Sequence, residues 1–94
     1  MAEESQIEGY LVRKVKEIGG LCWKFVSPGN VGVPDRLCLF LKGKALFVEV
    51  KSPGKKLRKI QLYRKKQLEE MGFKVYVIDS KEKVEVLINE IQSL

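Results

Sequence analysis

Two acids and a lysine interrupt a stretch of this sequence that otherwise resembles a buried β-hairpin. The stretch is GVPDRLCLFLKGKALFVEVK, residues 32–51, and the three charged residues are Asp35, Glu49 and Lys51. Charged side chains are rarely fully buried unless they are paired or bound to a ligand. The chain contains no histidine, so the metal-ligand atoms that the charged residues of this stretch offer are carboxylate oxygens. Mg²⁺ and Mn²⁺ prefer oxygen ligands.

The expected hairpin register brings the three charges together. A three-residue turn at residues 42–44 places Asp35 opposite Lys51, and the same register places Glu49 opposite Leu37. Opposite residues share a face of a sheet and side chains alternate along each strand, so all three charges emerge on one face near one end of the hairpin. A two-residue turn would instead move Asp35 to the other face.

The two carboxylates need a cationic partner. At about 5 Å apart they repel by roughly 3 kcal/mol at an effective dielectric of about 20, which a fold would not keep for stability alone. Lys51 can offset one charge, and the backbone carbonyl of Val50 can add an oxygen ligand to a metal ion. The alternative interpretation is a pair of solvated strand ends with a simple cross-strand contact between Asp35 and Lys51. The pattern alone does not decide between the two.

Hydrophobic periodicity predicts an α/β fold around this hairpin. Helical spacing of apolar residues indicates three helices, and short β-type runs flank the hairpin. A strand reached through a helix, added to an antiparallel hairpin, predicts a mixed four-stranded sheet flanked by helices. In chain order the expected elements are helix 4–18, strand 21–26, the hairpin within 32–51, helix 57–71, strand 74–78 and helix 80–92. The second helix is expected to turn Leu57, Ile60, Leu68 and Met71 toward the core.

Polar residues interrupt the apolar faces of the first two helices. Glu8 lies on the apolar side of the first helix, and Gln61 lies within the apolar stripe of the second. Either alone is more often a satisfied or partly solvated side chain. Together, beside a pair of carboxylates, they indicate helices that flank a site and reach into it.

Length and composition indicate one intracellular globular domain over residues 1–94. The chain is 45% hydrophobic and 32% charged, too apolar for a disordered protein, and it has no apolar run as long as a membrane span. The start MAEES fits neither a signal peptide nor a transit peptide. Cys22 and Cys38 have neither zinc-ligand nor disulfide-scaffold spacing and are expected to be small core residues. No histidine is present to activate a serine, and no phosphate-binding GxxxxGK[ST] loop occurs.

Basic residues gather where a phosphate backbone could bind. The net charge is +6, and four basic residues crowd the start of the second helix, where positive charge is unfavourable against the helix dipole unless an anion binds. No contact reads bases obviously, so recognition by shape and backbone is expected. The expected nucleic-acid contacts are Asn30, Arg36, Lys55, Lys56, Arg58, Lys59 and Arg64.

The spacing of these residues resembles a nuclease family. Pro34-Asp35 followed after thirteen residues by Glu49-Val50-Lys51 matches the PD-(D/E)xK signature. The longer series adds Glu8 and Gln61 and resembles the VRR-Nuc (virus-type replication-repair nuclease) family in its minimal stand-alone form, known in phages and bacteria. The similarity covers roughly residues 4–79. The archaeal Holliday junction resolvases, which share the restriction-endonuclease-like core, look similar too.

The resemblance implies an αβββαβ core, here followed by a C-terminal helix, and a role for each site residue. Asp35 and Glu49 would bind Mg²⁺ or Mn²⁺ and Lys51 would orient the attacking water. Glu8 would complete the acidic cluster through a water, with Glu4 as the alternative acid, and Gln61 would support the site.

The implied activity is metal-dependent hydrolysis of phosphodiester bonds in DNA, whether duplex or branched. A four-way junction needs two symmetric cuts, so the resemblance further implies a homodimer, with no membrane partner. A non-catalytic nucleic-acid-binding module on the same fold is the competing hypothesis. A phosphate-binding or RNA-binding housekeeping protein is a third interpretation, which the buried acids disfavour.

Overall fold

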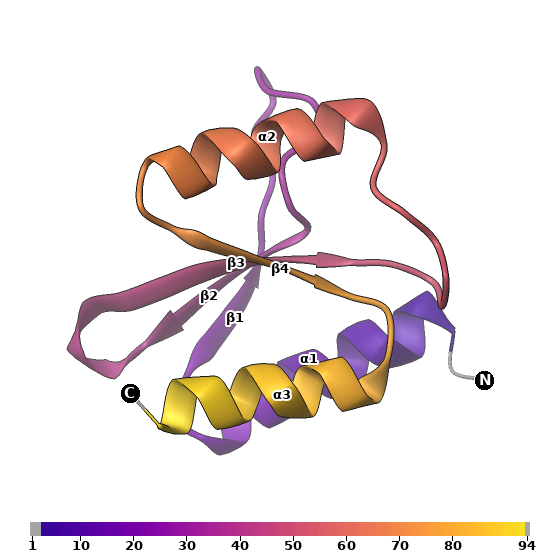
Figure 1. The fold of residues 1–94 in the computed structure, drawn as a ribbon. Helices are drawn as coiled ribbons and strands as arrows, with labels where there is room; N and C mark the ends of the chain where they lie inside the picture. Colours follow the sequence, from indigo (N-terminus) through magenta and orange to yellow (C-terminus); the bar gives the residue numbers. More distant parts are fainter. Residues whose placement is uncertain (1–2, 94) are drawn as a thin grey trace.

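A four-stranded mixed sheet separates two helical layers in the computed structural model, which describes residues 3–93. Helix α2 covers one face of the sheet, and α1 and α3 cover the other (Figure 1). Strands β1, β2 and β3 are antiparallel neighbours, and β4 runs parallel to β3. The elements are α1 (Glu4–Glu17), β1 (Leu21–Lys24), β2 (Arg36–Phe40), the 3-10 turn η1 (Leu41–Gly43), β3 (Lys44–Val50), α2 (Lys59–Glu70), β4 (Lys74–Ile78) and α3 (Lys81–Gln92).

This architecture confirms the predicted fold class. The order αβββαβα, with a hairpin and a strand reached through a helical crossover, is the one expected from hydrophobic periodicity. The predicted elements differ from the observed ones mainly at their ends, where fraying makes boundaries least certain. Residues 1, 2 and 94 of the predicted domain lie outside the described residues. No helix within residues 3–93 is long and apolar enough to cross a membrane.

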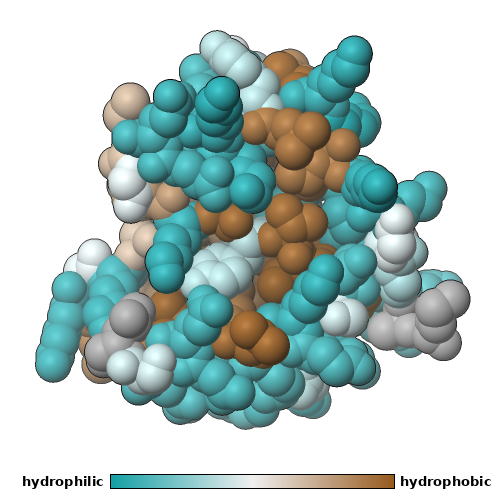
Figure 2. All heavy atoms as spheres, viewed as in Figure 1, coloured by the Kyte–Doolittle hydropathy of each residue, from teal (hydrophilic) through white to brown (hydrophobic). Residues whose placement is uncertain are grey.

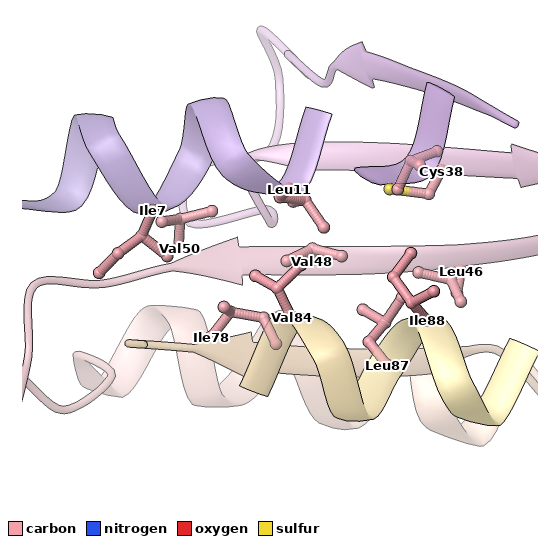
Figure 3. Packing of buried hydrophobic residues seen from close by; sticks show 11 residues of the cluster. Ile7, Leu11, Cys38, Leu46, Val48, Val50, Ile78, Val84, Leu87 and Ile88 are labelled. Carbon is pink, nitrogen blue, oxygen red and sulfur yellow. The ribbon is translucent and has the colours of Figure 1, made fainter. Parts of the chain in front are cut away.

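The hydrophobic core lies between the sheet and the layer of α1 and α3. Alternate residues of β3 point into it, and α1 contributes Ile7, Leu11 and Val15, each fully buried (Figure 3). These three residues are four apart in sequence, so they lie on one stripe of the helix, which explains why α1 packs there. On α3, Val84, Leu87 and Ile88 are buried.

The hairpin register differs from the predicted one by two residues. The turn is centred on Lys42, one residue earlier than expected, so Phe40 pairs with Lys44. Lys42 takes a left-handed conformation with φ 67°, which the short turn requires. One further step along the observed register places Asp35 opposite Glu49, and the prediction that Asp35 faces Lys51 is wrong. A shift of two preserves the alternation of faces, so the three charges still share one side.

The face of the sheet toward α2 is only partly covered. Phe47 of β3 packs between two other aromatic rings, at 5.4 Å from Phe25 and 5.6 Å from Phe73, measured between ring centroids. The prediction that Met71 faces the core is wrong, because Met71 is 76% exposed. Gln61 is the buried residue of α2 among those described. The helix therefore turns a polar side chain, rather than a full apolar stripe, toward the sheet.

Candidate active site

Asp35 is fixed by the strands on both sides of it. Its backbone carbonyl accepts a hydrogen bond from the Phe25 N–H at 2.8 Å, which extends the pairing of β1 and β2. Its Oδ2 accepts a hydrogen bond from the Val50 N–H at 2.9 Å. These two contacts anchor the backbone and orient the carboxylate toward the end of β3. The role of the Val50 N–H in orienting Asp35 was not foreseen from the sequence.

The backbone of Val50 also turns its carbonyl toward Asp35. The N–H and C=O of one strand residue point to the same side of the strand, whereas its neighbours point to the other side. The Lys51 N–H donates to the Ile78 carbonyl of β4, on the opposite side from Asp35. The Val50 carbonyl therefore points to the Asp35 side, where it was expected as a metal ligand.

Glu49 is a buried carboxylate beside a second carboxylate. The residue is 4% exposed. Its Oε2 accepts a hydrogen bond from Gln61 Nε2 at 3.0 Å and lies 3.6 Å from Lys51 Nζ. Burial, followed by the charge of Asp35, raises the pKa of Glu49 to about 7, and Lys51 counteracts only part of the rise. A cation added between the two carboxylates would relieve both effects.

Gln61 holds Glu49 and caps α2 at the same time. Its Oε1 accepts a hydrogen bond from the Arg58 N–H at 2.9 Å, so its amide nitrogen is the group that faces Glu49. A glutamine at this position of a helix can satisfy one of the unpaired N–H groups of the first turn. Arg58 stands at the N-cap position of α2, and the Gln61 side chain satisfies its backbone N–H.

The donor set fits a hard divalent cation. Asp35, Glu49 and the Val50 carbonyl offer oxygen atoms at one edge of the sheet, with no nitrogen or sulfur ligand among them. Mg²⁺ and Mn²⁺ accept such donors and keep several waters, so two carboxylates can suffice. Within residues 3–93 no group of three or more His, Cys, Asp or Glu residues could hold a metal ion. Any further ligands would therefore be waters or the substrate.

Glu8 is paired with basic side chains in this structure, and its predicted place in the acidic cluster, through a water, stays a prediction. Its Oε2 accepts a hydrogen bond from Arg36 Nε at 2.7 Å and lies 3.7 Å from Lys24 Nζ. Arg36 pairs with Val48, a core residue, so its side chain points to the α1 layer. Asp35 and Glu49 alternate to the α2 face instead. Glu4, the alternative, accepts a 3.5 Å hydrogen bond from Ser52 Oγ.

Comparison with known proteins gives the family of this chain. No family model matches the sequence. A curated relative, "Putative nuclease p44" of Acyrthosiphon pisum secondary endosymbiont phage 1, is 45% identical over 87 residues, which are 93% of this chain and 94% of the relative. A solved structure described as a VRR_NUC domain matches with a TM-score of 0.88 and 30% identity, over 95% of this chain and 97% of that one. The chain belongs to the VRR-Nuc family of nucleases.

The basic residues of this VRR-Nuc chain divide into exposed and engaged groups. Lys55, Lys56, Arg58 and Lys59 are exposed around the start of α2, and no ion pair involves them within the described part of the chain. Asn30 is exposed and donates to Ser27 Oγ. The loop and helix therefore present most of the expected contacts to solvent.

Two of the expected DNA contacts are tied into the VRR-Nuc fold. The Arg36 side chain is 17% exposed and is held by Glu8 and by the Cys22 carbonyl, which opposes the prediction that it is a free phosphate contact. Arg64 donates to the Val31 carbonyl at 2.8 Å and joins the loop between β1 and β2 to α2. Arg64 therefore helps to place the loop that leads to Asp35.

The raised pKa of Glu49 predicts a pH-dependent cost in stability. A carboxyl with a pKa of about 7 in the folded state and about 4.3 when unfolded destabilises the fold increasingly as pH rises between these values. Glu49→Gln should therefore raise the free energy of unfolding by up to about 4 kcal/mol at pH 8 and by little at pH 4. Denaturant unfolding without metal measures this, with Glu17→Gln as the exposed control. An equal gain at both pH values would contradict the assignment.

Proposed function

We propose that this chain is a divalent-metal-dependent DNA endonuclease that hydrolyses phosphodiester bonds at the site of Asp35, Glu49 and Lys51. The observation that carries the proposal is the buried Glu49 beside Asp35, with Lys51 Nζ 3.6 Å from Glu49 Oε2. A protein does not keep two such carboxylates together for stability, because the charge of Asp35 disfavours the ionised form of Glu49. Membership of a nuclease family supports the same activity.

Each side chain of the site has a role in this reaction. Asp35 and Glu49 would hold Mg²⁺ or Mn²⁺, with the Val50 carbonyl as a further donor. When bound, such an ion lowers the pKa of water and polarises the phosphoryl oxygen. Lys51 orients the attacking water and places positive charge where the phosphate gains negative charge. The hydrogen bonds from Gln61 and the Val50 N–H fix the two carboxylates, which limits the reorganisation needed during the reaction.

The exposed basic residues near α2 support binding of the DNA backbone. Lys55 and Lys56 line an open groove with Leu57, Leu62 and Val77, between α2 and the α3 side of the molecule. Figure 2 shows hydrophobic residues gathered between these two helices, with hydrophilic side chains around them. The four basic residues at this end of α2 give phosphate contacts that do not depend on sequence.

Removing two of these charges should weaken DNA binding and its dependence on salt. Replacing Lys55 and Lys56 together by serine should lower the slope of log K against log salt by roughly 2, if each contacts one phosphate. Lys16→Ser, on the exposed side of α1, is the matched control and should change neither quantity. Fluorescence anisotropy over a salt series measures both. An unchanged slope in the double variant removes these lysines from the interface.

We further propose that the enzyme acts on branched DNA as a homodimer. Support comes from β1, where Leu21 is 50% and Trp23 is 55% exposed although both are large and apolar. Both residues alternate to the face of the sheet that carries α2, and α2 packs against β4 at the other side of that sheet. An apolar strand left uncovered in this way suits a two-fold contact with a second copy.

Trp23→Lys should convert the dimer to a monomer. Sedimentation velocity over a range of concentrations measures the change. Val86→Lys on α3 is the control, because Val86 is similarly exposed, at 54%, but belongs to the other helical layer. A wild-type chain that is monomeric at all concentrations would remove the dimer from the proposal and leave the cleavage chemistry intact.

A panel of labelled substrates tests the proposed activity against the non-catalytic alternative. Four-way junction, flap, nicked and plain duplex DNA are incubated with Mg²⁺ or Mn²⁺ at a measured oligomeric state. The proposal predicts internal cuts that require the ion, with the junction cut fastest. A binding module predicts complexes that dissociate at high salt and no cleavage of any substrate with either ion.

A further inference from the structure

Two cysteines far apart in the sequence face each other across β1 and β2. Cys22 pairs directly with Cys38 in the antiparallel register. The Cys38 thiol donates to Cys22 Sγ at a sulfur-to-sulfur distance of 3.5 Å. Directly opposed residues of an antiparallel pair have Cβ atoms about 4.5–5.5 Å apart, slightly beyond the range usual in disulfides. A small movement of the edge strand β1 would therefore bring the two sulfur atoms to bonding distance.

The two thiols differ in their access to solvent. Cys38 is fully buried in the core between the sheet and α1 (Figure 3), whereas Cys22 is partly exposed on the edge strand. The hydrogen bond from Cys38, helped by the charge of Arg36, lowers the pKa of Cys22. Hydrogen bonding to Cys22 and burial raise the pKa of Cys38. Because the thiolate is the reactive form, Cys22 is the thiol that reacts with an oxidant first.

We infer that Cys22 and Cys38 are a redox-sensitive pair that forms a reversible intramolecular disulfide with a low-molecular-weight disulfide as oxidant. The Cys22 thiolate attacks one sulfur of the oxidant, forms a mixed disulfide and releases one thiolate. The sulfur of Cys38 then attacks Cys22 Sγ and displaces the second small thiolate. The proton of the Cys38 thiol passes to this leaving thiolate. The balance is two protein thiols and one small disulfide converted to one protein disulfide and two small thiols.

The disulfide would join the two strands that flank the loop leading to the candidate active site. Residues 25–35 connect β1 to β2 and end at Asp35, and the two cysteines stand on the strands that begin and end this loop. A bond between positions that are 16 apart in sequence restricts the unfolded chain and ties β1 to the sheet. A cross-strand disulfide whose geometry departs from the usual range is easily reduced, as a reversible modification requires.

Intact-mass measurement after oxidation tests the pair. The folded protein is incubated with oxidised glutathione, quenched with acid and analysed without reduction. The expected product is a monomer lighter by two hydrogen atoms, with a peptide that joins Cys22 to Cys38, and dithiothreitol should restore the original mass. Far-UV circular dichroism before and after treatment shows that oxidation occurs in the folded state.

Two variants separate this product from other outcomes. Cys38→Ala should stop at a stable glutathione adduct on Cys22, because the second thiol is absent. Cys22→Ser should resist modification at Cys38 while the protein stays folded, since that thiol is fully buried. A wild-type protein that accumulates the same unresolved adduct, links two chains through Cys22 or stays reduced at high oxidant would overturn the inference.

Discussion

Asp35→Asn is expected to lower the rate of DNA cleavage by about 1,000-fold or more while the protein stays folded. The substitution removes one of the two charged metal ligands, and a divalent ion contributes several kcal/mol to the transition state of phosphodiester hydrolysis. Each 1.36 kcal/mol of that contribution is worth tenfold in rate. Asparagine keeps an acceptor oxygen for the Val50 N–H, so the contact that now measures 2.9 Å can persist.

Single-turnover cleavage with saturating enzyme measures this loss, and thermal unfolding in Mn²⁺ shows whether it comes from the metal. Wild-type protein should be stabilised by the ion, whereas Asp35→Asn should gain little. Glu17→Gln, an exposed carboxylate that pairs with Arg13 and Lys14 on α1, is the charge-matched control and should behave as wild type. Full cleavage by Asp35→Asn would remove the residue from the active site.

Lys51→Met is expected to slow cleavage by about 100- to 1,000-fold with metal binding retained. This is the range found when one preorganised group that stabilises transition-state charge is removed. Methionine keeps most of the length of the side chain and removes its charge. Because Lys51 lowers the pKa of Glu49, the variant should also need a higher pH before Glu49 ionises and accepts the ion.

The pH dependence distinguishes the two roles of Lys51. Cleavage and Mn²⁺-dependent stabilisation are measured for both proteins over about pH 5–9. If Lys51 acts on the water and the phosphate, the rate of Lys51→Met stays low even at high pH, where the ion binds fully. If Lys51 only tunes Glu49, high pH restores the wild-type rate, and the proposed role in orienting water is wrong.

The shared face of the three site residues was predictable because it depends on alternation. Any odd-length turn near Gly43 leaves Asp35, Glu49 and Lys51 on one side, so an error of two in the register did not separate them. The apolar stripe of α1 was predictable for a similar reason, since helical spacing alone determines it. These features follow from local geometry and do not require the packing of distant elements.

The placement of Glu8 was not predictable in the same way. Its partner depends on which face of the sheet α1 covers, and both faces of β3 are apolar apart from Glu49 and the first residue, Lys44. The observed packing puts Glu8 beside Arg36 on the face away from the carboxylate pair. The pairing of Cys22 with Cys38 could not be predicted from the sequence either, because the loop between β1 and β2 has no short turn to define the register of the two strands.

The central claim is that the carboxylate pair supports metal-dependent DNA cleavage, and the rate of cleavage against metal concentration tests it most directly. A labelled four-way junction is incubated with excess protein freed of metal by EDTA, and Mg²⁺ or Mn²⁺ is then added in steps. We expect no product without the ion, a rate that rises and saturates as the ion is added, and complete arrest by excess EDTA. Cleavage that proceeds equally without the ion, or no cleavage at any concentration of either ion, would contradict the account.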